Sequence, residues 1–225
     1  MGTLVSFAAH GRSAQGYLAV PPSGTGPGLV VLQEWWGLVE HIKSIADRFA
    51  AAGFAALAPD LYRGEVAQTP DAAGKLLMAL NIAETGQALR GAAEYLIGLP
   101  AVSPKAVGVL GFCMGGQLAL FAAQEHGDVF AAAVDFYGIH PMVTIDPTRV
   151  KIPVLAHFGV RDAGVPVATA HGLAAAIRSA GGRCEDHEYD AGHAFFNDTR
   201  PEAYDAKSAD LAWDRTVEFL RRTLR

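Results

Sequence analysis

The sequence predicts an α/β fold in which a mostly parallel sheet is covered by helices on both faces. Short apolar runs alternate with helical patterns along the chain, and most of these runs are apolar on both sides of the strand that they would form. Strands of this kind belong to parallel sheets with helices on each face. The opening segments, 4–9 and 15–20, alternate around His10-Gly11-Arg12 and indicate an antiparallel hairpin at the sheet edge. We therefore expect a doubly wound sheet with an N-terminal hairpin.

The individual elements are predicted from two patterns of apolar residues. Nearly continuous apolar runs predict strands, and apolar positions spaced three to four residues apart predict helices. We expect strands, besides the hairpin, at residues 29–32, 54–58, 106–110, 131–134, 153–158 and 184–189. We expect helices at residues 42–52, 76–99 (with two helices as an alternative to one), 115–125, 167–180 and 203–224. No repeat, linker or low-complexity tract interrupts this order, so we expect a single domain over residues 1–225.

Composition and charge narrow the class of protein. Hydrophobic residues make up 51% of the chain and charged residues 18%, which excludes an intrinsically disordered protein. The net charge is −5 and no cluster of Lys or Arg occurs, so no nucleic-acid partner is expected. No apolar run approaches the ~20 residues that cross a bilayer, so no membrane partner is expected either. With only two cysteines, a reducing cytoplasm is the expected compartment, and a monomer or small homo-oligomer the expected state.

The segment Gly111-Phe112-Cys113-Met114-Gly115-Gly116 carries the most information about function. It joins a predicted strand to a predicted helix, and its Gly-x-nucleophile-x-Gly pattern is typical of the sharp turn that raises a nucleophile above a sheet. A thiol at the start of a helix has its thiolate favoured by the helix N-terminus. We therefore take Cys113 as the candidate nucleophile, with a small buried residue in a glycine-rich turn as the alternative. Cys184 lies in a predicted strand and is expected in the core.

Two residues downstream could complete a catalytic triad. Asp162 follows the strand predicted at 153–158, and His193 follows the one at 184–189. Hydrolases with this kind of turn place an acid and then a histidine after the nucleophile, on loops at the carboxyl ends of strands. Taken singly, Asp162 could cap the next helix and His193 could be a solvated loop residue. The order and the positions together favour the triad, and no motif for a metal ion or a phosphate-bearing cofactor is present.

Several motifs resemble the dienelactone hydrolase (carboxymethylenebutenolidase) family. The resemblance covers nearly the whole chain, and a cysteine elbow combined with an upstream Gln-Glu-x-x-Gly is highly specific. It implies an α/β-hydrolase fold that cleaves an ester or lactone with no cofactor. The matching segments are Gln33-Glu34-Trp35-Trp36-Gly37, Pro59-Asp60-Leu61-Tyr62, Gly111–Gly116, Asp135-Phe136-Tyr137-Gly138 and Gly192-His193-Ala194-Phe195.

The resemblance also implies a role for each matched residue. Cys113 corresponds to the nucleophile, His193 to the base and later acid, and Asp162 to the residue that orients the imidazole. Glu34 corresponds to a glutamate that contacts the resting thiol and takes part in its activation when substrate arrives. A small-molecule ester or lactone is the expected partner. A thioesterase or amidase on the same triad, or a catalytically silent ligand-binding protein, is the alternative.

The resemblance extends to the oxyanion hole and the substrate pocket. The backbone N–H groups of Trp35 and Met114 correspond to the oxyanion donors, the second of them following the nucleophile directly. Trp36 and Tyr137 fall where the family lines its pocket with aromatic side chains, and core packing is the alternative for both. These assignments place the substrate between the loop after the strand at 29–32 and the elbow.

One feature of the family is missing from this sequence. The dienelactone-cleaving enzymes hold the substrate carboxylate with two arginines, one of them four residues after the catalytic histidine. Asn197 occupies that position here, and the segment 65–75, where the other arginine is expected, contains none. Arg63 or Arg200 could substitute, with surface solvation as the alternative for each. The departure puts dienelactone itself in doubt as the substrate and leaves the hydrolase chemistry in place.

Overall fold

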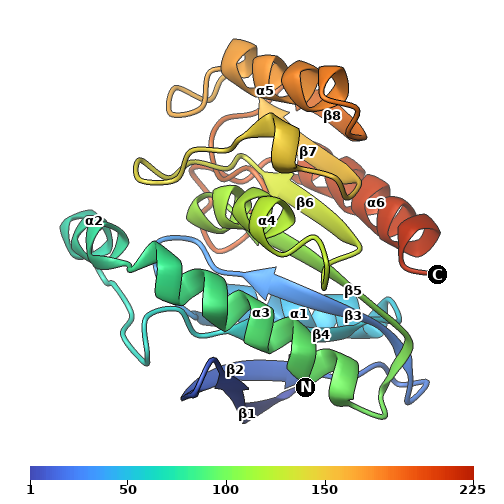
Figure 1. The fold of residues 1–225 in the computed structure, drawn as a ribbon. Helices are drawn as coiled ribbons and strands as arrows, with labels where there is room; N and C mark the ends of the chain where they lie inside the picture. Colours follow the sequence, from blue (N-terminus) through green and yellow to red (C-terminus); the bar gives the residue numbers. More distant parts are fainter.

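The computed structural model describes residues 1–225 and contains one eight-stranded sheet with helices on both faces (Figure 1). The strand order is β1-β2-β4-β3-β5-β6-β7-β8. The hairpin strands β1 and β2 pair antiparallel, and β2 pairs antiparallel with β4, whereas every other neighbouring pair is parallel. The predicted fold class and the N-terminal hairpin are confirmed.

The bounds of the elements locate the loops that carry the site. The strands are β1 (Thr3–Ala9), β2 (Arg12–Ala19), β3 (Gly26–Leu32), β4 (Ala55–Pro59), β5 (Val102–Phe112), β6 (Ala132–Phe136), β7 (Val154–Gly159) and β8 (Cys184–Tyr189). The helices are α1 (Glu40–Ala51), α2 (Pro70–Ala79), α3 (Ile82–Gly98), α4 (Met114–Glu125), the 3₁₀ turn η1 (Pro147–Arg149), α5 (Val167–Ser179) and α6 (Ala206–Thr223). No helix is both long and apolar enough to span a membrane.

Two apolar cores, one on each face of the sheet, hold the layers together. Helices α1 and α6 cover one face, and α3, α4 and α5 cover the other (Figure 1). Successive residues of β3 alternate between the cores, with Val30 and Leu32 on the α3–α4 side and Leu29 and Val31 on the α1–α6 side. All four are fully buried, which is why the strand reads as a continuous apolar run. Burial of each such side chain contributes roughly 2 kcal/mol.

The segment predicted as one helix or two at 76–99 forms two helices with different bounds. Helix α2 begins at Pro70 because the Thr69 side chain accepts a hydrogen bond from the Ala72 N–H and proline suits the first helical position. Helix α3 begins at Ile82 because Asn81 caps the Glu84 N–H in the same way. The single-helix alternative is wrong, since a cap residue at position 81 interrupts the apolar pattern. The last helix likewise begins later than predicted, after the capping residue Asp205.

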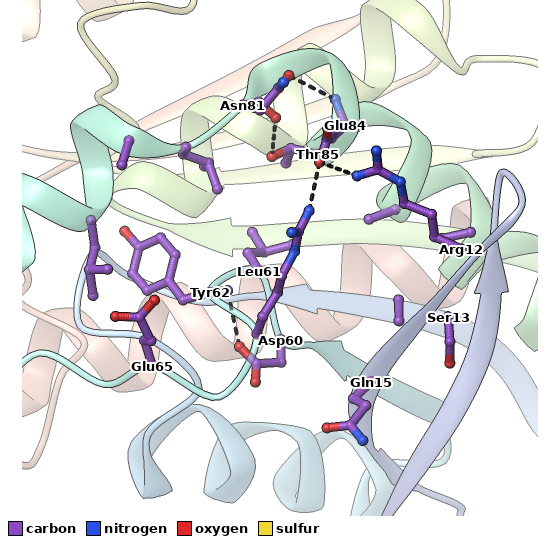
Figure 2. Close-up of a pocket in the computed structure, with 17 residues that line it drawn as sticks. Arg12, Ser13, Gln15, Asp60, Leu61, Tyr62, Glu65, Asn81, Glu84 and Thr85 are labelled. Carbon is purple, nitrogen blue, oxygen red and sulfur yellow. Dashed lines mark hydrogen bonds and ion pairs between the residues drawn. The ribbon is translucent and has the colours of Figure 1, made fainter.

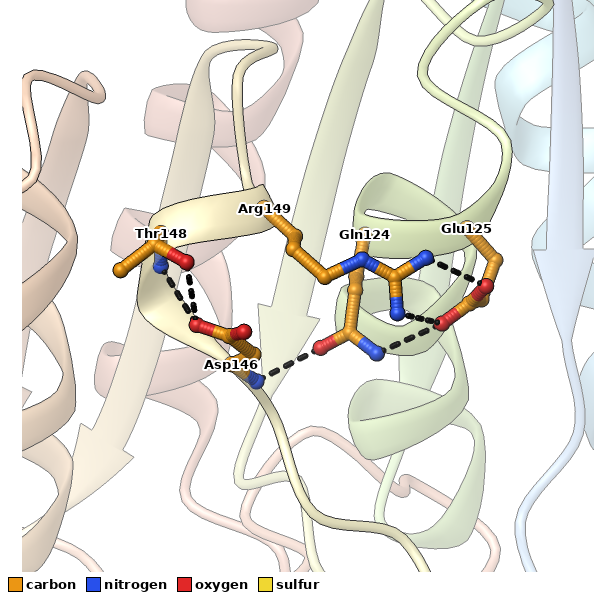
Figure 3. Close-up of polar contacts among 5 residues, drawn as sticks. All are labelled: Gln124, Glu125, Asp146, Thr148 and Arg149. Atoms are coloured by element: carbon orange, nitrogen blue, oxygen red, sulfur yellow. Dashed lines mark hydrogen bonds and ion pairs between the residues drawn. The ribbon is translucent and has the colours of Figure 1, made fainter.

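The connection between β6 and β7 is tied to helix α4 at both ends. Near its start, the Ile139 N–H donates to the Cys113 carbonyl at 3.1 Å. Near its far end, Arg149 makes two 2.7 Å contacts with the Glu125 carboxylate, while Gln124 joins Glu125 to the backbone of Asp146 (Figure 3). This network lies at the surface and contributes modestly to stability, but it fixes the path of a connection that passes over the strand–helix turn.

Candidate active site

The turn between β5 and α4 places Cys113 in a strained conformation. Its φ of 53° and ψ of −118° fall outside the regions that L-residues usually occupy. Both neighbouring glycines are required by space. A Cβ at Gly111 would lie 2.1 Å from the Gly115 carbonyl oxygen, and one at Gly115 would lie 2.6 Å from that of Gln33. The half-buried Cys113 side chain thus stands at the carboxyl end of the central strands, at the start of a helix.

His193 and Asp162 form a short hydrogen bond on the loops after β8 and β7. The Nδ1 atom of His193 lies 2.6 Å from Oδ2 of Asp162, whose side chain is 1% exposed. The other oxygen of Asp162 accepts the N–H groups of Gly164 and Val165 at 2.8 and 2.9 Å. Helix α5 has no side-chain cap, so the capping alternative for Asp162 is wrong. The backbone donors and the histidine together fix the carboxylate in one orientation.

The electrostatics of this pair favour a charged imidazole. Burial lowers the pKa of His193, but the hydrogen bond with Asp162 and the influence of Cys113 outweigh that effect and raise the pKa to about 10. Burial raises the pKa of Asp162, and the bonds from His193 and the two backbone N–H groups more than compensate, so that the net shift is downward. His193 and Asp162 are therefore joined by a hydrogen bond, and Cys113 contributes to the raised pKa of His193, although the three residues come from three separate loops.

Glu34, at the end of β3, is buried beside Asn197. Its Oε2 accepts a hydrogen bond of 2.7 Å from the Asn197 side-chain amide, while Oε1 is buried without a protein partner. Burial raises the pKa of Glu34, and the Asn197 bond and the charges of His193 and Arg200 oppose that shift. The residue that occupies the position of a family arginine thus serves as a neutral partner of Glu34. This contact joins residues far apart in sequence, and no local pattern signals it.

The two expected oxyanion donors have backbone N–H groups free of protein acceptors. The Trp35 N–H takes part in no backbone hydrogen bond of the loop between β3 and α1. Met114 is the first residue of α4, and the first N–H groups of a helix have no partner within it. The side chain of Met114 is buried and accepts a hydrogen bond of 3.2 Å from the Tyr62 hydroxyl at its sulfur atom. An oxyanion hole at these two positions remains a prediction.

The two aromatic candidates for the pocket lie in different environments. Trp36 is half-buried, and the guanidinium of Arg200 stacks over its ring at 5.1 Å. Tyr137 is fully buried, with a φ of 43°, and its ring lies 5.1 Å from that of His193 and 5.3 Å from that of Phe195. Tyr137 therefore packs against His193 from within the core, whereas Trp36 reaches solvent and can meet a ligand.

A cleft near this site contains Arg63, one of the two arginines that could receive a substrate carboxylate. It has a volume of about 660 Å³ and is lined by the hairpin, the segment after β4, and helices α2 and α3 (Figure 2). Arg63 and Arg12 both pair with one oxygen of Glu84 in this cleft, at 2.6 and 2.8 Å (Figure 2). No residue of the triad lines the cleft. Arg63 is thus engaged by a carboxylate of its own chain, and Arg200 by Glu202 at 2.7 Å.

The fold and the geometry of the site together define the class of protein. An eight-stranded, mostly parallel sheet with a strained residue at a strand–helix elbow, and an acid and a histidine on later loops, is the α/β-hydrolase architecture. The model of the dienelactone hydrolase family matches residues 14–224. The chain therefore belongs to the dienelactone hydrolase family, and it is a hydrolase of the ester or lactone type.

Relatives and solved structures agree with this assignment. The chain is 36% identical to Protein usf of Aquifex pyrophilus over all of both chains. It is 33% identical, again over all of both chains, to a protein of Aquifex aeolicus (strain VF5) named as a proposed carboxymethylenebutenolidase. The crystal structure of a proposed dienelactone hydrolase from Klebsiella pneumoniae superposes with a TM-score of 0.84 at 26% identity, covering 97% of this chain and 98% of the other.

Proposed function

We propose that this hydrolase cleaves carboxylic esters or lactones through a covalent thioester on Cys113, with His193 and Asp162 as the other members of a triad. The observation that carries the proposal is the short hydrogen bond between His193 and Asp162 beside the strained elbow of Cys113, which we extend to a series from the thiol through the imidazole to the carboxylate. The backbone donors to Asp162 hold the far end of this series rigid. A preorganised series of this kind is what nucleophilic catalysis by a thiol requires.

In the acylation step, the Cys113 proton passes to Glu34 and the thiolate attacks the carbonyl carbon of the substrate, while His193 is already in its charged imidazolium form. The carbonyl oxygen becomes an oxyanion, which the N–H groups of Trp35 and Met114 stabilise. One such donor contributes about 3 kcal/mol to a transition state of this type. The intermediate collapses when the carbon–oxygen bond to the leaving group breaks, and the imidazolium of His193 gives its proton to the departing alkoxide. The product is a thioester on Cys113.

In the deacylation step, His193 takes a proton from a water molecule, and the resulting hydroxide attacks the thioester carbon. The second tetrahedral intermediate occupies the same oxyanion hole. Collapse expels the Cys113 thiolate and releases the carboxylic acid. The proton held by Glu34 returns to the sulfur, and His193 keeps the proton that it took from water. Asp162 orients Nδ1 of His193 in both steps and stabilises its charged form.

Glu34 is assigned to the activation of the thiol. Because burial raises the pKa of Glu34, its carboxylate takes up a proton readily once substrate displaces the remaining water. Its partnerless Oε1 is the atom available for that proton.

The proposal is tested by hydrolysis of p-nitrophenyl acetate and of a dienelactone, before and after treatment with iodoacetamide. Cys113→Ala and His193→Ala should each abolish turnover to a comparable extent, because members of a triad act as a unit. Cys184→Ala is the matched control, since Cys184 is the other thiol and lies buried in β8. A thioester and an anilide in the same panel show whether the site acts as a thioesterase or an amidase instead. Full activity in Cys113→Ala would overturn the covalent mechanism.

A further inference from the structure

A buried acid outside the triad lies directly beneath the elbow. Asp135, in β6, is 1% exposed, and its Oδ1 atom is buried without a hydrogen-bond partner. In the sheet it lies opposite Gly111 of β5 on one side and Ala156 of β7 on the other. A buried carboxyl group with an unsatisfied oxygen costs stability and is rare away from functional sites. The proposed mechanism gives Asp135 no role.

The carboxyl group occupies a slot made by two glycines. A Cβ at Gly116, in the first turn of α4, would lie 2.3 Å from Oδ1 of Asp135. A Cβ at Gly138, in the turn after β6, would lie 2.4 Å from the same atom. Real side chains do not approach so closely, and a backbone atom also lies 2.8 Å from the first of these Cβ positions and 2.6 Å from the second, so both positions require glycine. The carboxyl group therefore fills the contact between helix α4 and the turn that follows β6.

That turn is the segment which holds Cys113 in place. The Cys113 N–H donates to the Phe136 carbonyl at 2.9 Å, and the Cys113 carbonyl accepts the Ile139 N–H at 3.1 Å. Both partners lie within a few residues of Asp135 on the same strand and turn. A change in how Asp135 packs must therefore reach both backbone contacts of the nucleophile, because interiors transmit strain.

The charge state of Asp135 also affects His193. Burial raises the pKa of Asp135 to about 7, against the opposing effects of the Gly138 N–H and the charge of His193. The titratable groups that interact with it are His193 from the loop after β8 and Cys184 from β8. Its partners in the neighbouring strands, Gly111 and Ala156, and its neighbour Gly116 in helix α4 do not titrate.

We propose that Asp135 is a positioning residue of the hydrolytic site, which locks the turn that clamps Cys113 and, when ionised, stabilises the imidazolium of His193. The inference rests on the proposed function of Cys113 and His193. Below neutral pH the group is neutral and acts by packing alone. Above neutral pH it adds a buried negative charge that favours the protonated form of His193.

Two variants separate the two effects. Asp135→Asn keeps the shape of the group but removes its ionisation, and Asp135→Ala empties the slot. The rate of p-nitrophenyl acetate hydrolysis is followed from about pH 5 to about pH 9, and the titration of His193 is followed by NMR with labelled histidine. Asp128→Asn, at an exposed acid paired with Arg90, is the control.

In the wild type, kcat/KM should show an inflection near about pH 7 that Asp135→Asn lacks, and the His193 midpoint should fall by about half a pH unit or more in that variant. Asp135→Ala should lower kcat at least about tenfold, with KM nearly unchanged, because the nucleophile is displaced. Superimposable pH profiles and His193 midpoints for wild type and Asp135→Asn would overturn the inference. Activity in Cys113→Ala would instead overturn the proposed function, so the two failures are distinguishable.

Discussion

At the scale of single residues, the candidate site combines a partly exposed thiol and imidazole with three buried acids. Cys113 and His193 reach solvent, while the carboxyl groups of Asp162, Glu34 and Asp135 are buried. Each acid has a different environment. Asp162 accepts the imidazole and two backbone N–H groups, Glu34 accepts one amide, and Asp135 keeps an oxygen without a partner. These differences drive the pKa of Asp162 down and those of the other two up.

The role of Glu34 is tested by Glu34→Gln, which keeps the size of the side chain and removes its ability to take up a proton. Single-turnover kinetics should show acylation slowed by about a hundredfold, a typical effect of losing a general base. Deacylation should change little, because His193 activates the water. Glu40→Gln, at an exposed position on α1, serves as the control. If acylation is untouched, Glu34 has a structural role only.

The charge of the preferred substrate depends on Asn197 and on the arginines near the site. Asn197 is neutral and already bonded to Glu34, and Arg63 is paired with Glu84. An anionic substrate would lose hydration in the site without a free arginine to receive it, and a good Arg–carboxylate contact contributes on the order of 1.5–3 kcal/mol. We expect a neutral lactone to have a kcat/KM at least equal to that of a dienelactone of similar size.

The ratio of kcat/KM for the dienelactone to that for the neutral lactone is measured in the wild type and in Arg200→Ala. A ratio above about ten in favour of the dienelactone would mean that a cation already serves the substrate carboxylate. Loss of that preference in Arg200→Ala would identify the cation as the arginine stacked on Trp36.

At the scale of elements, the elbow depends on close approach between β5, α4 and the loop after β3. A Cβ on Gly115 would lie 2.6 Å from the Gln33 carbonyl oxygen and 2.7 Å from that of Leu32. These are backbone atoms of a central strand and its continuation, which cannot move without disturbing Glu34. Because the contact involves backbone on both sides, no rearrangement of side chains relieves it.

Gly115→Ala should therefore lower the free energy of unfolding by about 3 kcal/mol, measured by urea denaturation, and should also abolish esterase activity. Gly172→Ala is the matched control, since Gly172 is helical in α5 and a Cβ there meets nothing within 4 Å. That variant should gain about 0.5–1 kcal/mol through the better helix propensity of alanine. Equal effects of the two substitutions would show that the elbow is not tightly packed.

At the scale of the whole molecule, the spacing of apolar residues predicted the layers of sheet and helices. It could not predict the contacts between loops. A buried parallel strand forms a continuous apolar run in the sequence. The strands predicted at residues 29–32 and 106–110 therefore lie inside β3 and β5, which are both longer. Cys113, Asp162 and His193 could be predicted as neighbours from the loops that carry them, because the carboxyl ends of parallel strands meet at one edge of the sheet. The Asn197–Glu34 bond and the slot of Asp135 depend on tertiary packing between distant segments, and no sequence period encodes them.

The stability of the molecule should depend on pH through Asp135. Its pKa is about 7 in the folded protein and about 3.8 in the unfolded chain, so the unfolded chain releases this proton first as pH rises. The contribution of Asp135 to stability is thus lost between about pH 4 and about pH 7, to an extent on the order of a few kcal/mol. Asp135→Asn should match the wild type in urea denaturation near about pH 4 and exceed it near about pH 8. An equal difference at both pH values would contradict this linkage.

The central claim is that Cys113 carries the acyl group during turnover. The most direct measurement is mass spectrometry of enzyme quenched in acid while it turns over p-nitrophenyl acetate, followed by peptide mapping. The account predicts one acetyl group on the peptide that contains Cys113, absent from Cys113→Ala and unaffected in Cys184→Ala. Steady hydrolysis with no acetyl group on Cys113, or with the group on another residue, would contradict it.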